Sequence, residues 1–194
     1  LAAGPSVGVA LVGDGAVDSF KRLVETELVP ALGDCVWCAD SAEHVDAMTR
    51  AYFAKPPACR LSNTALAIVK PSAMANLGLV MDAMCCDAGF AMTGAASFTL
   101  DRVDAVEFLE VYKGVVPEFA AMVDELTSGS FVAMEVALSE DGGSGENGVV
   151  EALREACGPA DPEIARVLRP QSVRAKFGFD KVRNAVHCTD LPED

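Results

Sequence analysis

Short apolar runs predict four β-strands in the later part of this chain. The runs lie at 65–69, 90–100, 131–138 and 184–187. Glycine, proline or polar residues stand at most of their ends, as is typical of strands that pack in a core.

Helical spacing of apolar residues fills the intervals between these runs. After the first run, apolar residues recur every three or four positions until Gly89, which is a stop signal. These residues are Leu77, Val80, Met81, Met84 and Ala88. Asp101 is an N-cap candidate for a helix that runs past Phe108, and further helices are expected at 119–126 and 148–157.

The interval 158–183 carries no such pattern, and we expect a long ordered loop there. A loop of this length inside a compact domain is usually functional. The glycine-rich, acidic segment 139–148 is predicted to be a surface insertion. The element order βαββαβ, with additional helices, predicts an α+β fold of the ferredoxin-like class.

Two parts of the chain resemble each other in sequence, and the order of the matches is preserved. The matched pairs are 4–12 with 129–137, 15–22 with 148–155, and 34–40 with 184–190. Preserved order indicates tandem copies of one domain. We predict that 1–55 is the C-terminal part of a degenerate first domain, 56–62 a linker, and 63–194 a second domain without its last helix. The chain opens inside a continuing segment, so we take it as a piece of a longer protein.

The two copies differ where chemistry would lie. Trp37 of the first copy occupies the position of His187 in the second, and an indole cannot act as a nucleophile. Val24 and Asp34 are 10 positions apart, whereas the matching Cys157 and Asn184 are 27 apart. Either a true deletion or an omission of residues would produce the shorter interval. The first copy is predicted to be inactive.

Charge is distributed unevenly along the chain. The formal net charge of -14 repels polyanions at long range, so we expect no nucleic-acid partner. Six of the 15 Lys and Arg residues nevertheless lie between 166 and 183, with Asp180 as the only acid among them. They are Arg166, Arg169, Arg174, Lys176, Lys181 and Arg183. A basic cluster just before His187 suits the phosphates of one nucleotide. The same spacing also fits a solvated basic loop beside a core histidine.

Hydropathy and cysteine content argue against a membrane-spanning protein and against a small disulfide-linked scaffold. No apolar run reaches the roughly 18 residues that a membrane span needs, so we expect no membrane partner. The seven cysteines are odd in number and lack the spacing of a disulfide scaffold. They are expected to be reduced intracellular thiols.

Several motifs taken together resemble the nucleoside diphosphate kinases. They are Lys70 after the first strand and the segments 127–129, 158–162, 172–178 and 184–187. These motifs stand in the order and spacing of the family over residues 62–194. Residues 4–53 resemble the later half of a second such domain.

The resemblance implies phosphate transfer through a phosphohistidine at His187. The γ-phosphate of a nucleoside triphosphate would pass to His187 and then to a nucleoside diphosphate. Mg²⁺ would be carried by the nucleotide, with no metal site in the protein. An imidazole with an unperturbed pKa of about 6.5 is largely neutral at pH 7 and is a good nucleophile.

The resemblance also assigns roles to five other residues. Arg154 and Arg174 would neutralise phosphate charge with planar, multi-donor groups, and Lys70 would reach the transferred phosphate as a point charge. Asn184 would contact the sugar. Phe119 would stack on the base, which accommodates any base because each has a π-face.

This chain departs from the family pattern at three places. Leu109 falls where the family has a tyrosine near the histidine, with a one-residue insertion around 114–116. Ala160 replaces a phosphate-binding threonine. The segment 188–190 reads Cys-Thr-Asp in place of the commoner Gly-Ser-Asp.

The tandem copies, together with 111–116 and 157–166, resemble the ciliary branch of the family. That likeness implies a place in the axoneme of a cilium or flagellum, or in the cytoplasm, with tubulin and other doublet proteins as partners. Two alternatives stand beside a kinase held in the axoneme. One is a purely structural microtubule inner protein without turnover, and the other is a soluble kinase.

Overall fold

The structure is a computed structural model of the chain, and it describes residues 8–54, 62–138 and 148–190. The chain divides into two compact units, residues 1–58 and 59–194. Each unit is described by itself. Most of the predicted linker and of the glycine-rich insertion lies outside the described residues.

The first unit is helical in its described part. Its elements are α1 (Ala16–Leu23), the π-helical turn η1 (Val24–Leu28), α2 (Val29–Leu32), the 3-10 turn η2 (Gly33–Cys35) and α3 (Ala42–Tyr52). Within the described residues of this unit, Val24 is the only buried apolar side chain.

The strands that the repeat predicts in the first unit are not formed in its described part. Residues 8–12 and 36–39 have no regular structure, and 4–7 lie outside the described residues. A strand is stable only when it pairs with others and packs one face. No described segment of this unit supplies such a partner, so sequence similarity to a strand is not sufficient here.

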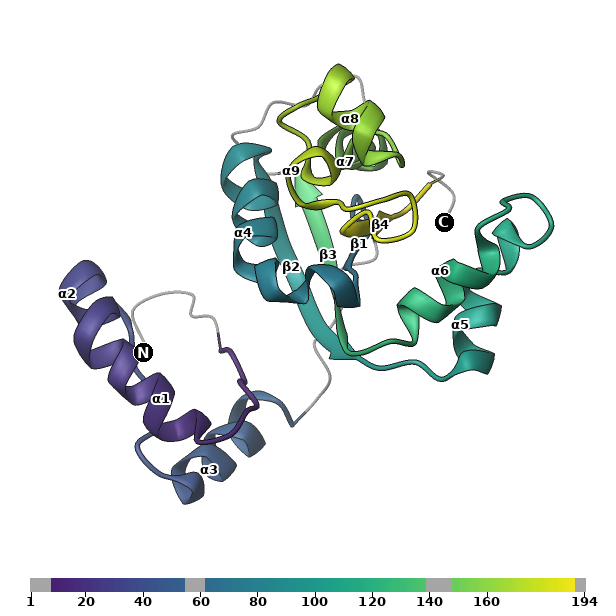
Figure 1. The fold of residues 1–194 in the computed structure, drawn as a ribbon. Coiled ribbons are helices and arrows are strands. Elements are labelled where there is room, and N and C mark those ends of the chain that lie inside the picture. The colour runs from purple at the N-terminus through teal and green to yellow at the C-terminus, as the bar shows by residue number, and fades with distance from the viewer. Residues whose placement is uncertain (1–7, 55–61, 139–147, 191–194) are drawn as a thin grey trace. The chain divides into compact units, whose positions relative to one another are not determined.

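Four antiparallel strands form the sheet of the second unit (Figure 1). They are β1 (Ala65–Val69), β2 (Phe90–Phe98), β3 (Phe131–Leu138) and β4 (Val186–Cys188), in the order β2-β3-β1-β4. β1 pairs with β3 and β4, and β2 pairs with β3. The first and third strands are central and the second and fourth lie at the edges, which confirms the predicted α+β, ferredoxin-like class.

Helices occupy each interval between the strands. Between β1 and β2 lie η3 (Pro71–Asn76), α4 (Leu77–Asp82) and η4 (Ala83–Asp87). Between β2 and β3 lie α5 (Arg102–Phe108), η5 (Glu110–Tyr112) and α6 (Phe119–Leu126). The first helix after β3 is α7 (Val149–Cys157). Asp101 caps α5 as predicted. Its carboxylate accepts from the N–H groups of Val103 and Asp104 at 2.8 and 3.0 Å.

The interval 158–183 is not the irregular loop that the sequence predicts. It contains α8 (Pro162–Leu168) and α9 (Val173–Phe177). The carboxylate of Asp161 caps α8 by accepting from the N–H of Glu163 at 2.9 Å. Helices of 7 and 5 residues are too short to show an apolar period, and such helices depend on tertiary packing.

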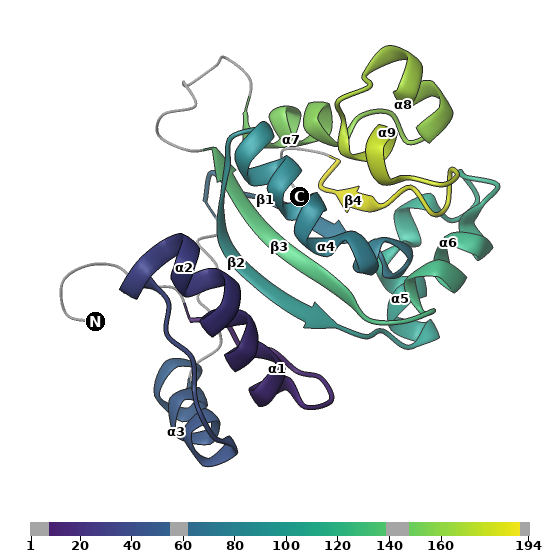
Figure 2. The same ribbon diagram turned by 60° about the vertical axis from the view of Figure 1, so that its left-hand side comes forward.

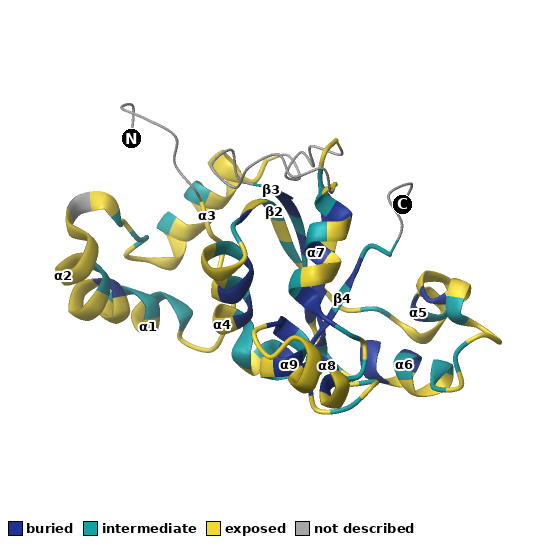
Figure 3. Ribbon diagram, turned by 90° about the horizontal axis from the view of Figure 1, so that it is seen from above, coloured by how far each residue is buried: buried dark blue, intermediate teal, exposed yellow. Residues whose placement is uncertain are grey.

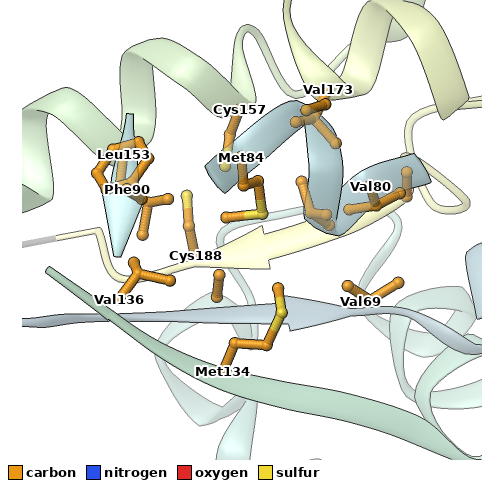
Figure 4. Packing of buried hydrophobic residues seen from close by; sticks show 14 of the residues in the cluster. Val69, Val80, Met84, Phe90, Met134, Val136, Leu153, Cys157, Val173 and Cys188 are labelled. Carbon is orange, nitrogen blue, oxygen red and sulfur yellow. The ribbon is translucent and has the colours of Figure 1, made fainter. Parts of the chain in front are cut away.

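Alternation along β1 divides the core between the two faces of the sheet. Ala67 and Val69 lie in the larger cluster, with residues of α4, α7 and α9 (Figures 2 and 4). Ile68 lies in the second cluster, where Leu109 and Leu126 cover the opposite face. Burying one such aliphatic side chain contributes about 1.5–3 kcal/mol. Buried residues therefore concentrate along the central strands, as Figure 3 shows.

Among the helices in 8–54, 62–138 and 148–190, none is both long enough and apolar enough to cross a membrane.

Gly178, directly after α9, allows a close approach that a side chain would prevent. A Cβ there would lie 2.6 Å from the carbonyl oxygen of Arg174 and 2.6 Å from Cγ of Pro162. We predict that Gly178→Ala lowers the free energy of unfolding by about 1–3 kcal/mol, because the backbone and the proline ring must shift. Urea unfolding measures the change.

Gly78 in α4 provides the matched control. No atom lies within 4 Å of its Cβ position. Gly78→Ala is expected to leave stability unchanged or to raise it by about 0.5–1 kcal/mol, since alanine favours a helix. Equal unfolding midpoints for the two variants would contradict the packing described for Gly178.

Candidate active site

A tight turn before β4 sets the direction of His187. Ala185 has a φ of 72°, in the left-handed region that residues with a side chain rarely adopt. Across the turn, the N–H of Val186 donates to the carbonyl of Asn184 at 2.9 Å. The N–H of Lys70 donates to the carbonyl of Ala185, also at 2.9 Å. The turn is therefore anchored to the end of β1.

His187 projects to the sheet face that Ile68 also faces. The two residues lie opposite each other in the antiparallel ladder of β1 and β4, and opposed residues share a face. The rings of Phe108 and Tyr112 stand edge-on to the imidazole, with centroid distances of 5.4 and 6.1 Å. Two uncharged aromatic rings thus restrict the position of the imidazole.

The imidazole of His187 is held in its neutral form. Burial and, to a smaller extent, the nearby charge of Lys70 lower the pKa of His187 from 6.5 to about 4, although Asp190 opposes both. At pH 7 the ring therefore keeps a free lone pair. A neutral imidazole is the form that attacks an electrophile.

Lys70 extends from the end of β1 into a polar cluster and is only 8% exposed. Its Nζ donates to the carbonyl of Val182 at 2.9 Å and to Oδ1 of Asn184 at 2.7 Å. Nδ2 of Asn184 in turn donates to the carbonyl of Ala160 at 2.9 Å. Burial lowers the pKa of Lys70 from 10.5 to about 8, with the charge of Arg174 adding to the effect. The ammonium is still mostly charged at pH 7.

Two arginines fasten β4 and the chain after it. Arg174 donates from Nε and Nη2 to the carbonyl of Val186 at 3.2 and 3.1 Å, and from Nη1 to the carbonyl of Gly158 at 2.7 Å. Arg154 donates from Nη1 to the carbonyl of Asp190 at 2.5 Å. These contacts fix the orientation of each guanidinium and leave other N–H groups for an anion.

One cavity of about 910 Å³ connects these groups, a volume within the range of small-molecule sites. Five of the six residues predicted from the sequence line it: Lys70, Arg154, Arg174, Asn184 and His187. They come from β1, α7, α9 and the turn into β4. The fold therefore brings together residues up to 117 positions apart, from 70 to 187.

Phe119 is the predicted residue that the structure does not bring to the cavity. It packs with Val123 and Leu126 against the second core cluster, because these positions share one face of α6. Glu118 and Met122 line the cavity from this segment instead.

Tyr112 is the residue that sequence reasoning missed. Leu109, taken as the substitute for the family's tyrosine, is 3% exposed in the second core cluster. Tyr112 lines the cavity, stands against His187 and donates its hydroxyl proton to a carboxylate oxygen of Asp190. Tyr112 comes three positions after Leu109, in the 3-10 turn η5, so matching single motif positions did not point to it. A second aromatic residue within one turn of the matched position is the signal that could have found it.

Five acidic side chains also line the cavity, and two of them form ion pairs with basic residues outside the central cations. Glu155 pairs with Arg169 at 2.7 Å and Asp161 with Lys181 at 3.7 Å. No carboxylate in the described ranges forms an ion pair with the three central cations. These cations are Lys70, Arg154 and Arg174, and their charge remains available to an anionic ligand.

The described residues offer no resident metal site. No group of three or more His, Cys, Asp or Glu residues among them is placed to hold a metal ion. The site therefore combines a neutral imidazole, fixed cations and a buried amide, which is suited to binding and transferring an anionic group.

Comparison with known proteins assigns this architecture to a family. The sequence profile described as nucleoside diphosphate kinase matches residues 63–194, which is the second unit without its first four residues. The chain belongs to the nucleoside diphosphate kinase family. The five residues that line the cavity all lie within the matched part.

Similarity to individual proteins of the family supports this assignment. Nucleoside diphosphate kinase homolog 7 of Mus musculus is 39% identical over 219 aligned residues, covering 100% of this chain and 53% of the relative. The nucleoside diphosphate kinase of Aquifex aeolicus is 37% identical over 130 residues, 66% of this chain and 84% of that protein. The crystal structure of an Aquifex aeolicus nucleoside diphosphate kinase superimposes with a TM-score of 0.58 at 36% identity, covering 67% of this chain and 86% of that one. The chain spans about half the length of the mouse relative.

The low pKa of His187 has a measurable consequence. We predict that its imidazole titrates near pH 4 in the native protein, as followed by NMR of the ring carbons. His44 is the only other histidine, so a His44→Gln variant assigns the two signals. Lys70→Met is expected to raise the midpoint of His187 but not to restore it fully, because burial is the larger cause.

The same shift predicts how stability depends on pH. A native pKa below the unfolded value means that the unfolded chain binds this proton more tightly. The contribution of neutral His187 to the free energy of unfolding is therefore complete above pH 6.5 and is lost as the pH falls toward 4. A native midpoint near 6.5 would contradict the burial described for the ring.

Proposed function

We propose that the second unit transfers the γ-phosphate of a nucleoside triphosphate to a nucleoside diphosphate through a phosphohistidine at His187. The observation that carries this proposal is the neutral, confined imidazole of His187 in one cavity with Lys70 and Arg174. Nucleophile and phosphate-binding cations are the two components that such a transfer needs.

The first half-reaction forms one bond and breaks one. A ring nitrogen of His187 attacks the γ-phosphorus, and the bond from that phosphorus to the β,γ-bridging oxygen breaks, so the nucleoside diphosphate leaves with the electron pair. The second half-reaction is the reverse with another diphosphate. The protein regains its neutral imidazole, so one site serves both halves.

The cations act on the charge that the phosphates carry in the transition state. Lys70 is buried and fixed by Val182 and Asn184, so it needs little reorganisation when charge shifts. Arg174 is fixed by the carbonyls of β4 and of the segment after α7. Mg²⁺, which the family generally uses, would be held by the nucleotide phosphates and would add to this neutralisation.

The substrates follow from the family and the cavity. Nucleoside di- and triphosphates fit a cavity whose central cations have no carboxylate partner in the described ranges. The sugar contact assigned to Asn184 agrees with the place of its side chain in the cavity. The base would lie toward Val116, Glu118 and Met122, which line the cavity from the segment around the start of α6.

The first unit is proposed to be non-catalytic. Trp37, at the position that matches His187, is 55% exposed, and its ring contacts His44 edge-on at 5.1 Å. We propose that residues 1–55 are the later part of a first kinase-like domain and that 63–194 are the second. Similarity to the mouse relative over the whole chain supports this division.

We also propose a location, on the tandem resemblance alone. The chain would belong to the axonemal doublet of a cilium or flagellum, packed against tubulin and neighbouring proteins. With a net charge of -14 it is not drawn to acidic tubulin by simple attraction, so the contacts would depend on shape and specific pairing. A soluble kinase is the alternative that the extraction experiment below distinguishes.

Labelling with γ-labelled ATP tests the transfer. We predict that the wild-type chain takes up label, that acid removes it, and that His187→Ala takes up none. Lys70→Met should slow labelling by about 100-fold, since one charge-stabilising donor is lost. His44→Ala, in the first unit, is the control that keeps full labelling. Acid-stable label, or label on the His187 variant, rules out the phosphohistidine.

High-salt extraction of axonemes tests the location. We predict that the protein stays with the insoluble doublets and that the His187→Ala form incorporates equally, because incorporation requires the folded surface and not the nucleophile. Release into the soluble fraction would favour the soluble kinase. Failure of a normally folded His187→Ala protein to incorporate would tie placement to turnover and contradict a structural attachment.

A further inference from the structure

Two buried cysteines lie directly beside the candidate active site. Cys157 is the last residue of α7 and Cys188 the last residue of β4, with exposures of 0% and 2%. Both are free thiols in the larger core cluster, where Figure 4 shows their sulfur atoms turned toward each other. The two thiols lie close enough for each to shift the pKa of the other. Contact of two thiols from separate elements is the geometry from which a disulfide forms.

The two thiols differ in chemical character. The hydrogen bond from Cys157 and the charge of Arg174 lower the pKa of Cys188, although burial opposes them. Nη2 of Arg174 lies 3.9 Å from Sγ of Cys188. The same hydrogen bond, together with burial, raises the pKa of Cys157. Cys188 is therefore the thiolate of the pair and Cys157 the proton donor.

Access also distinguishes the two thiols. Cys188 lines the 910 Å³ cavity, whereas Cys157 does not. A small oxidant that enters the cavity meets Cys188 first. Cys85 and Cys86 are more exposed, but burial and Asp82 raise the pKa of Cys85, and a hydrogen bond with Asp82 raises that of Cys86. Exposure alone would select the wrong thiols, because reactivity follows the thiolate.

We propose that Cys188 and Cys157 form a redox-active pair that hydrogen peroxide converts into an intramolecular disulfide. In the first step the Cys188 thiolate attacks one peroxide oxygen, the O–O bond breaks, and with one proton taken up a sulfenic acid and water are produced. In the second step the Cys157 sulfur displaces the hydroxyl group, which leaves as a second water with the Cys157 proton. Both sulfurs are oxidised and both peroxide oxygens are reduced.

Closing this disulfide changes the site above it. The two sulfurs must approach to a bond of about 2.05 Å, which draws the end of β4 toward the end of α7. Arg174 loses the thiolate that faces it, and His187 precedes the residue that moves. Displacement of a reacting group by about 1 Å can slow a reaction by about 100-fold. The disulfide form is therefore expected to transfer phosphate more slowly, a consequence that rests on the proposed function.

Peptide mapping of the full chain tests the pair itself. The protein is treated with hydrogen peroxide, free thiols are blocked with N-ethylmaleimide, and the digest is analysed by mass spectrometry without reduction. We expect one cross-linked peptide pair joining Cys157 to Cys188, which dithiothreitol separates. The double variant Cys85→Ser/Cys86→Ser should give the same cross-link. A map in which Cys157 and Cys188 remain blocked by maleimide, or in which the cross-link involves Cys85 or Cys86, overturns the proposal.

A variant separates the two steps. In Cys157→Ala the second thiol is absent, so Cys188 should stop at the sulfenic acid and react with dimedone. Dimedone on Cys85 or Cys86 instead of Cys188 contradicts the assigned thiolate. The wild-type map needs no variant, so it decides the case if Cys157→Ala does not fold.

The phosphate-transfer consequence is measured on the same samples. Labelling of His187 by γ-labelled ATP should fall by about 100-fold on oxidation and return on reduction, while the Cys157→Ala protein should show no reversible fall of that kind. Absence of label in the reduced protein would contradict the proposed kinase activity. The peptide map would still decide whether the disulfide forms. Equal labelling of the reduced and the fully cross-linked protein would show that the disulfide does not act on the site.

Discussion

The strained turn at Ala185 is the constraint on which the site depends. A left-handed φ at a residue with a side chain costs on the order of 1–3 kcal/mol and persists only where surrounding contacts enforce it. Here the backbone of Lys70 holds the turn from β1, and Arg174 holds the following carbonyl of Val186. The turn lets two side chains three positions apart take different surroundings. Asn184 contacts Lys70, whereas His187 lies against Phe108 and Tyr112. A relaxed turn would separate His187 from Lys70, which act on the same phosphate in the proposed transfer.

Burying the charged ammonium of Lys70 also costs free energy, and hydrogen bonds to the ammonium offset that cost. An isolated buried ammonium would lose its proton, yet burial moves the pKa of Lys70 only to about 8. Hydrogen bonds to Val182 and Asn184 hold the charged form in place. The same positive charge adds to burial in lowering the pKa of His187. In the proposed transfer, Lys70 would therefore both meet the phosphate and help to keep the nucleophile neutral.

The sequence carried enough information for the strands of the second unit and for most of the residues that line the cavity, but not for features that depend on packing. The bounds of β1 and β3 could be predicted to the residue, because a compact apolar run can be recognised in the sequence without knowing what it packs against. The helices within 158–183 could not, since helices as short as 7 and 5 residues are stabilised by their neighbours. Tyr112 was missed because it lies three positions after Leu109, and the folded 3-10 turn η5 is what brings it against His187. Phe119 has the expected residue type, but the phase of α6 turns it into the core.

Local and global charge have separate consequences in this chain. The net charge of -14 acts at long range, and salt screens it beyond roughly 8–10 Å. Within the cavity, Lys70, Arg154 and Arg174 can act on a bound anion at contact distance, where the Coulomb attraction is strongest. An acidic protein can therefore bind a polyphosphate wherever its cations have no carboxylate partner. Pairing at the margin, as between Arg169 and Glu155, confines the positive region to the place where His187 would react.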